Sequence, residues 1–185
     1  MTRMTGLYKF QGLTVLASRQ AHELTGWAAG IASAAWVMHR GAAGPAYVLA
    51  LATVVAGYLG GTAPDWLEMV PWRKGKRWCT HRTITHWVPA WAGLAYGANY
   101  MLTAHWWYGP LFGFAAGGLV HLLIDWPNPR GIPIFWSRHS LNLWNSGRAD
   151  SFVVAACWVA AAWLFDRLLF GSVHFHRALA LLDLA

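Results

Sequence analysis

Five runs of mostly apolar residues follow one another along the chain, separated by shorter polar segments. They span approximately residues 24–38, 46–63, 87–104, 107–126 and 151–170. A membrane-spanning helix needs roughly 17–25 mostly apolar residues. The first run is short for a span, so we expect its helix to begin near Ala21. The pattern predicts an all-α, polytopic membrane protein with about five transmembrane helices.

The composition favours a surface that faces lipid. Hydrophobic residues make up 57% of the chain and charged residues 11%, whereas a typical soluble domain carries about 25% charged residues. The chain also contains 14 Trp and 19 Gly, which are common in membrane helices and at membrane interfaces. Gly57-x-x-Gly60 and Gly113-x-x-x-Gly117 would allow helices to approach closely. Too little polar surface remains for a soluble nucleic-acid-binding protein, so we expect no nucleic-acid partner.

Lys and Arg residues are concentrated in alternate loops. Five spans place eleven of the 14 basic residues on one side of the membrane. The positive-inside rule then predicts a cytoplasmic N-terminus and an external C-terminus. Anionic membrane lipid and membrane orientation account for the net charge of +7 better than nucleic acid does.

We therefore expect residues 1–185 to form a single membrane domain. Residues 1–20 mix basic and apolar side chains, which favours an interfacial N-terminal segment. Residues 65–86 would form a basic inner loop, and residues 171–185 an outer tail with a short amphipathic helix.

Ionisable residues from four parts of the chain are predicted to meet at the cytoplasmic ends of the spans. They are His22, Asp65, Glu68, His81, His86, His121 and Asp125. His121 and Asp125 are four residues apart, so both project from one face of a helix. We expect His81 in the loop and His86 in the first turn of the third helix. Each residue alone has an ordinary structural explanation, but ionisable groups at membrane depth are costly and usually functional.

Imidazole and carboxylate groups without thiolates favour zinc over other metals, with manganese or iron as alternatives. The predicted ligands are His22, Asp65, His81, His86, His121 and Asp125. They exceed the needs of one tetrahedral site, so one or two ions are both compatible with the sequence. The two cysteines form no CxxC pair, which argues against a structural Cys-rich site.

This donor set predicts hydrolysis of an ester or phosphoester by metal-activated water. Asp65 or Glu68 would serve as the general base. Arg82, Arg138 and His139 lie on the same side of the membrane and are predicted to bind substrate. A site at the lipid–water interface suits a small molecule or a lipid, such as a phospholipid.

Four short motifs occur in order over residues 20–140. They are His22-x-x-x-Gly26, Pro64-Asp65, His81-Arg82-x-x-x-His86 and His121-x-x-x-Asp125. In this order they resemble the metal-dependent hydrolases of the YdjM/YbcI-like family, which implies an enzyme of the bacterial inner membrane. The family's Pro-Asp-x-Asp cluster appears here as Pro64-Asp65-Trp66-Leu67-Glu68, so the second acid lies one position later.

A non-enzymatic role is the alternative. The same groups could hold a structural metal in a membrane adaptor that binds a soluble partner or anionic lipid. An open coordination position would favour the enzyme, and a closed one the adaptor. A transporter would need ionisable groups through the middle of the spans, where the sequence has almost none apart from Asp166 and Arg167.

Overall fold

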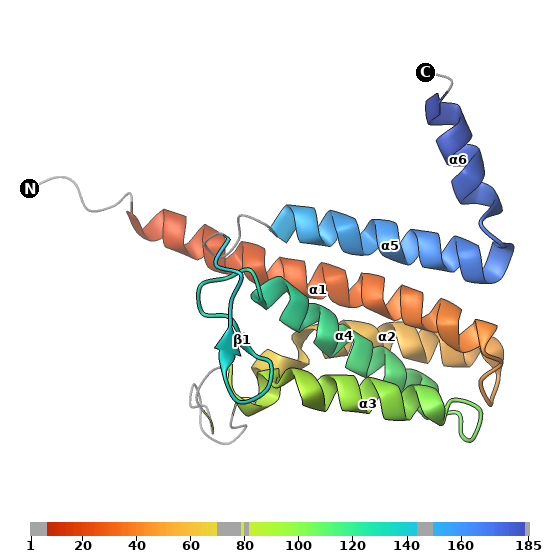
Figure 1. Cartoon of the computed structure of the whole chain (residues 1–185), viewed down its shortest axis with the longest axis horizontal. Helices are drawn as coiled ribbons and strands as arrows, with labels where there is room; N and C mark the ends of the chain where they lie inside the picture. The colour runs from red at the N-terminus through yellow and green to blue at the C-terminus, as the bar shows by residue number, and fades with distance from the viewer. Residues whose placement is uncertain (1–6, 70–78, 80–81, 144–149, 184–185) are drawn as a thin grey trace, which may run out of the picture.

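The computed structural model describes residues 7–69, 79, 82–143 and 150–183. This part of the chain contains six α-helices, one short 3₁₀ helix and two very short strands (Figure 1). The elements are α1 (Leu7–His39), α2 (Ala46–Trp66), η1 (Ile84–His86), α3 (Val88–Tyr100), α4 (Tyr108–Asp125), β1 (Ile132–Pro133), β2 (Arg138–His139), α5 (Asp150–Phe170) and α6 (Val173–Asp183). The predicted all-α class is confirmed.

Helices α1 to α5 lie side by side with the chain reversing direction between successive helices, and α6 turns away from the bundle (Figure 1). Helix α2 packs against α1 and α4, while α3 packs on α4 and α5 on α1. This arrangement brings the start of α3 and the ends of α2 and α4 to the same end of the bundle. The predicted helix in residues 171–185 is also present, as α6.

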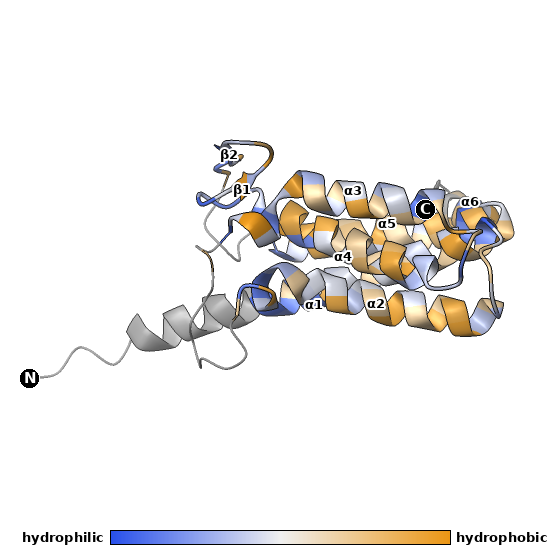
Figure 2. Cartoon of the chain, turned by 90° about the horizontal axis from the view of Figure 1, so that it is seen from below, coloured by the Kyte–Doolittle hydropathy of each residue, from blue (hydrophilic) through white to orange (hydrophobic). Residues whose placement is uncertain are grey.

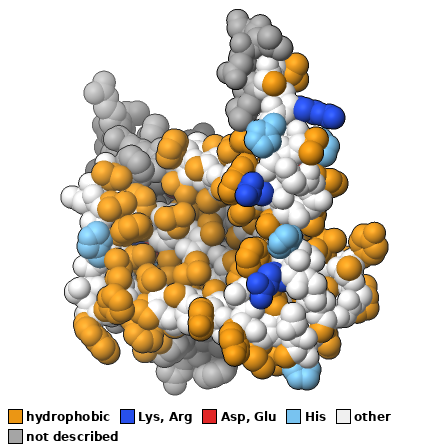
Figure 3. Space-filling view, turned by 45° about the vertical axis from the view of Figure 1, so that its right-hand side comes forward, with side chains coloured by type: hydrophobic (Ala, Val, Ile, Leu, Met, Phe, Trp, Pro, Cys, Tyr) orange, Lys and Arg blue, Asp and Glu red, His pale blue; other side chains and the backbone are white. Residues whose placement is uncertain are grey.

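Among the described residues, three helices are long and apolar enough to cross a membrane: α2, α4 and α5. Apolar segments run along the bundle helices in Figure 2, and apolar side chains are spread over the face seen in Figure 3. Helix α3 has only 13 residues, and α1 has 33 residues with its apolar run in the second half. The polytopic fold is therefore supported, whereas the count of five spans stays a prediction.

Glycines bring α1, α2 and α4 into backbone contact. A Cβ atom on Gly57 would lie 2.3 Å from the Cα of Gly30, and one on Gly117 would lie 2.2 Å from the carbonyl oxygen of Gly57. Neither position can accept a larger side chain unless the helices separate. The predicted close approach at these glycines is confirmed. It holds together α1, α2 and α4, the three helices that carry most of the candidate site.

A small hairpin covers the end of the bundle next to α3. Strands β1 and β2 pair antiparallel, with Ile132 opposite His139. Gly131 precedes the hairpin with φ +56°, a backbone conformation that glycine adopts without strain. The indole Nε1 of Trp87 donates to the carbonyl oxygen of Phe135 at 3.0 Å, so the hairpin is attached to the segment that carries His86.

Candidate metal centre

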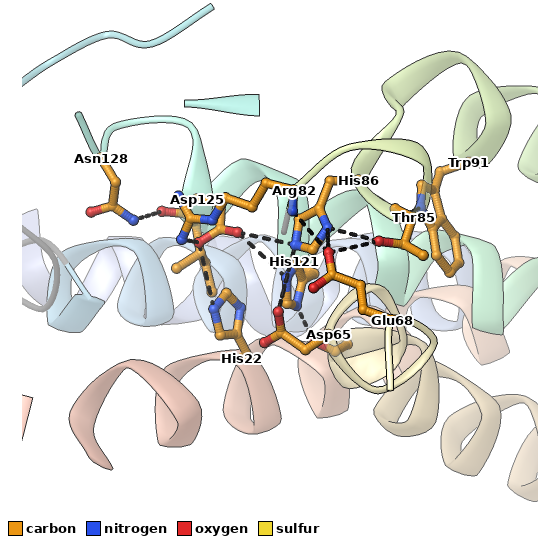
Figure 4. A network of polar contacts seen from close by, with 12 residues as sticks. His22, Asp65, Glu68, Arg82, Thr85, His86, Trp91, His121, Asp125 and Asn128 are labelled. Atoms are coloured by element: carbon orange, nitrogen blue, oxygen red, sulfur yellow. Dashed lines mark hydrogen bonds and ion pairs between the residues drawn. The ribbon is translucent and has the colours of Figure 1, made fainter. Parts of the chain in front are cut away.

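Five of the six predicted ligands lie within the described residues, and they come together at one end of the bundle (Figure 4). The sixth, His81, lies outside the described residues, as does most of the predicted basic loop. His22 comes from α1, Asp65 from the last turn of α2, and His121 and Asp125 from α4. The convergence predicted from the sequence is confirmed for these four positions and for His86.

His86 occupies a different element from the one expected. It ends the 3₁₀ helix η1, and α3 begins only at Val88. Pro89 explains this boundary, because proline lacks an N–H and favours the first turn of a helix. The expectation that His86 lies in the first turn of the third helix is therefore wrong. The 3₁₀ turn directs its ring toward α4 instead.

His86 and His121 present their Nε2 atoms to each other. Nδ1 of His121 lies 2.8 Å from the carbonyl oxygen of Gly61, and Nδ1 of His86 lies 3.1 Å from both Oε1 of Glu68 and Oγ1 of Thr85. The hydroxyl proton of Thr85 is donated to Glu68, so both Nδ1 atoms face only acceptors and each Nε2 carries a lone pair. The two Nε2 atoms are 3.3 Å apart. Two lone pairs facing each other at this distance require a proton or a cation between them.

Two carboxylates complete triangles with this pair of nitrogens. Oδ1 of Asp65 lies 3.6 Å from Nε2 of His86 and 3.9 Å from Nε2 of His121. Oδ2 of Asp125 lies 3.5 Å from each. Ligands of a tetrahedral zinc ion, bound at 2.0–2.1 Å, are separated by about 3.3 Å. The donor atoms therefore have both the chemistry and the spacing of a divalent metal site.

His22 belongs to a second, overlapping group with His121 and Asp125. Its Nε2 lies 3.7 Å from Oδ1 of Asp125, and its ring stacks on His121 with centroids 3.9 Å apart. Its Nδ1 is buried and has no hydrogen-bond partner among the described residues. Nδ1 of His121 is already engaged with Gly61, so His121 offers one lone pair and can complete only one of the two groups at a time.

Glu68 and Arg82 form a layer behind the ligands. Oε1 of Glu68 accepts from the backbone N–H of Arg82 at 2.8 Å and from the hydroxyl of Thr85 at 2.9 Å, besides its contact with His86. The guanidinium of Arg82 in turn forms a buried ion pair with Asp125 through Nη2. Hydrogen bonds of this kind fix the orientation of metal ligands and tune their basicity.

A model of the YdjM inner membrane protein family matches residues 18–182. The chain belongs to the YdjM inner membrane protein family. The match confirms the resemblance found in the sequence motifs and the inner-membrane location. A search of curated proteins and a search of solved structures gave no significant match. In this family member, the buried His and Asp groups could hold a metal ion.

The centre is closed on most sides and accessible at Asp65. The side chains of His86, His121 and Asp125 are at most 1% exposed, whereas that of Asp65 is 49% exposed. Burial lowers the pKa of His86 below its ordinary value, which keeps this ring neutral and able to bind a metal. Among the described ligands of the centre, Asp65 is therefore the one in contact with solvent.

The predicted substrate-binding residues lie next to the centre. Arg82 is itself part of the buried layer, and Nη2 of Arg138 donates to the carbonyl oxygen of Arg82 at 3.0 Å. Nδ1 of His139 accepts from the indole of Trp126 at 2.8 Å. Sequence reasoning missed the carbonyl of Gly61, because no side-chain pattern reveals a backbone acceptor.

Proposed function

We propose that this inner-membrane protein is a metal-dependent hydrolase of an ester or phosphoester. The observation that carries the proposal is the triangle formed by Nε2 of His86, Nε2 of His121 and Oδ1 of Asp65, because its donors have the spacing of metal ligands. Three protein ligands with an accessible side are typical of catalytic sites, whereas structural sites are closed by four.

The donor set of two imidazoles and a carboxylate fits zinc, with manganese or iron as alternatives. A bound divalent ion would supply Lewis acidity and would lower the pKa of a water molecule. His86 and His121 would hold the ion, together with Asp65 or Asp125.

The other groups of the site have separate tasks. Asp65 is the accessible carboxylate, so where Asp125 completes the ligand set, Asp65 is the better candidate to accept the proton that water releases. Water oxygen replaces the leaving oxygen on the acyl or phosphoryl centre, and the leaving oxygen takes up a proton. Glu68 is fully buried and accepts one hydrogen bond from the backbone N–H of Arg82 and one from the hydroxyl of Thr85. Its contacts favour a positioning role for it through His86.

The cytoplasmic face is the expected side of the reaction. All five described ligands lie at the bundle end toward which the basic loops are predicted to project, and eleven of the 14 Lys and Arg residues fall on that side in the five-span topology. A membrane lipid or a small amphipathic molecule would meet the site there.

Metal content tests the proposal directly. Detergent-purified wild type, His86→Ala and His121→Ala are compared by elemental analysis, with His105→Ala as the control because His105 is exposed in the loop before α4. We expect stoichiometric transition metal in wild type and in the control, and none in the other two variants. Wild type that binds no metal even after reconstitution with zinc or manganese would refute the proposal.

Activity separates the hydrolase from the adaptor. A phosphoesterase and esterase screen should give turnover that Asp65→Asn abolishes while the protein stays folded. A metal with four protein ligands by X-ray absorption, together with no turnover in the screen, would favour a metal-stabilised adaptor that binds a soluble partner or anionic lipid.

A further inference from the structure

A pocket of about 340 Å³ lies between the η1 segment and the β1–β2 hairpin. Its lining includes two guanidinium groups, from Arg82 and Arg138, and three aromatic side chains, from Trp87, Phe135 and Trp136. We call it the arginine–aromatic pocket. It adjoins the metal centre, because Arg82 both lines the pocket and pairs with the ligand Asp125.

Arg82 is held in an unusual state. Its φ of 59° is in the left-handed region, which is uncommon and strained for a residue other than glycine. The surrounding structure fixes it there, because its N–H is bonded to Glu68 and its carbonyl oxygen to Arg138. Backbone strain of this kind is concentrated at functional sites.

The side chain of Arg82 also has donors to spare. The residue is only 9% exposed, and Nη2 is bonded to Asp125. Its Nε and Nη1 have no hydrogen-bond partner among the described residues. Buried donors without partners are rare and unfavourable in folded proteins, so they point to an acceptor that is supplied from outside.

The chemistry of the missing acceptor follows from the donors. A guanidinium presents its N–H groups in a planar fork that matches the oxygens of phosphate or carboxylate. A neutral carboxylic ester has no anionic oxygen to offer, whereas a phosphoester keeps a negative charge on its non-bridging oxygens. The aromatic side chains offer an apolar surface to the rest of the molecule. Trp136 and Phe135 are 95% and 65% exposed, as expected at a lipid–water interface.

We propose that the arginine–aromatic pocket binds the anionic phosphoryl oxygens of the substrate, which makes the substrate a phosphoester and not a carboxylic ester. This inference rests on the proposed function. Phosphoryl oxygens bonded to Arg82 lie next to Asp125 and thus beside the metal ligands. The aromatic walls hold the organic part of the molecule, whether it is a lipid or a soluble group.

Calorimetric titration of the full-length protein in non-ionic detergent tests the proposal. The probes are inorganic phosphate and dihexanoyl phosphatidic acid, each used before and after dialysis against a chelator, so that binding to arginine is separated from binding to metal. Arg138→Gln should weaken binding of both probes about tenfold or more, the usual effect of losing a charged hydrogen bond. The control is Arg130→Gln, which removes the same charge from an exposed position in the loop between α4 and β1 and should change affinity less than twofold.

Ser137→Asp gives an independent test, because Ser137 is exposed, lines the pocket and contributes no guanidinium. A carboxylate placed there should repel the anion and weaken binding as Arg138→Gln does. The proposal is overturned if wild type binds neither probe, or if Arg130→Gln weakens binding as much as Arg138→Gln.

The two probes also distinguish the source of the phosphate. Tighter binding of phosphatidic acid, with an advantage that Trp136→Ala removes, identifies a lipid head group. Equal affinity for both probes identifies a soluble phosphoester. If chelator-treated protein binds the probes but metal-loaded protein hydrolyses nothing in any screen, the hydrolase is refuted and the pocket is retained. Hydrolysis of a phosphoester that is unchanged in Arg138→Gln and Ser137→Asp would refute the pocket and retain the hydrolase.

Discussion

Replacing Glu68 with Gln should weaken metal binding without removing it. Glu68 does not belong to either group of candidate ligands in the described residues, but its Oε1 lies 3.1 Å from Nδ1 of His86. Together with the hydroxyl oxygen of Thr85, which lies 3.1 Å from the same nitrogen, that contact keeps the proton on Nδ1 and the lone pair on Nε2. Gln can still accept hydrogen bonds from Arg82 and Thr85 through its amide oxygen, so the fold should survive the change.

The size of the effect follows from the loss of charge. A hydrogen bond to a charged group contributes about 1.5–3 kcal/mol and a neutral one about 0.5–1.5 kcal/mol. Replacing the charged acceptor with a neutral one therefore destabilises the metal-binding tautomer of His86 by about 1–2 kcal/mol. At 1.4 kcal/mol per factor of ten, this corresponds to a roughly 5- to 30-fold loss of metal affinity. Groups that orient metal ligands typically contribute 10–100-fold, so we expect a loss of about tenfold.

Competition with a chromophoric zinc chelator measures this loss in detergent-purified protein. Glu23→Gln is the matched control, because Glu23 pairs only with the neighbouring Arg19 on the surface of α1 among the described residues, and its affinity should equal that of wild type. Wild-type affinity in Glu68→Gln would refute the positioning role. A loss as complete as in His121→Ala would show that Glu68 is itself a ligand.

Three further predictions concern helix packing, the buried ion pair and the membrane topology. Gly57→Ala should lower the free energy of unfolding by about 1–3 kcal/mol and reduce metal content. Its control is Gly97→Ala, where an added Cβ meets nothing within 4 Å, which should be neutral or slightly stabilising. Equal melting temperatures of the two variants in detergent would contradict this prediction. Asp125→Asn leaves the buried guanidinium of Arg82 without its counter-ion and should lower the free energy of unfolding by about 3–5 kcal/mol. Chemical denaturation measures this loss, and an unchanged midpoint would refute the prediction. Five spans place the C-terminus outside the cytoplasm. Alkaline phosphatase fused to the C-terminus should therefore be active, and a fluorescent protein fused there should not fluoresce. The reverse result would indicate an even number of spans.

Much of the centre could be predicted from the sequence because helix periodicity and chain reversal are local. His121 and Asp125 share a helix face by their spacing alone. The alternation of apolar runs and polar loops was sufficient to predict that His22, Asp65 and His86 lie at the same end of the bundle as His121 and Asp125. Burial then followed from position, since ligands at the ends of packed helices are covered by the neighbouring helices.

The roles of Glu68 and Arg82 could not be predicted, because they depend on contacts between distant segments. Glu68 follows the end of α2 at Trp66. Arg82 comes fourteen residues after Glu68 in the sequence, yet its backbone N–H donates to the Glu68 carboxylate. The left-handed backbone of Arg82 has no local sequence signal, since such conformations usually occur at glycine or asparagine. The 3₁₀ turn of His86 was missed for a related reason: Pro89 sets the start of α3 two residues after the histidine.

The charges of the described residues support a single divalent ion. Asp65, Glu68 and Asp125 bring three negative charges to the centre and Arg82 brings one positive charge. With the histidines neutral, as metal ligands must be, two negative charges remain. Uncompensated charge is costly at Glu68 and Asp125, which are buried, and less so at Asp65, which is half exposed. One divalent ion balances them, so we expect one equivalent of metal per chain; two equivalents would require ligands beyond these. A neutral centre attracts no phosphoester through its net charge. The attraction then has to come from a further guanidinium beside the centre. Arg82 and Arg138 both line the adjoining pocket, and because Arg82 is already counted in this balance, Arg138 supplies the additional positive charge.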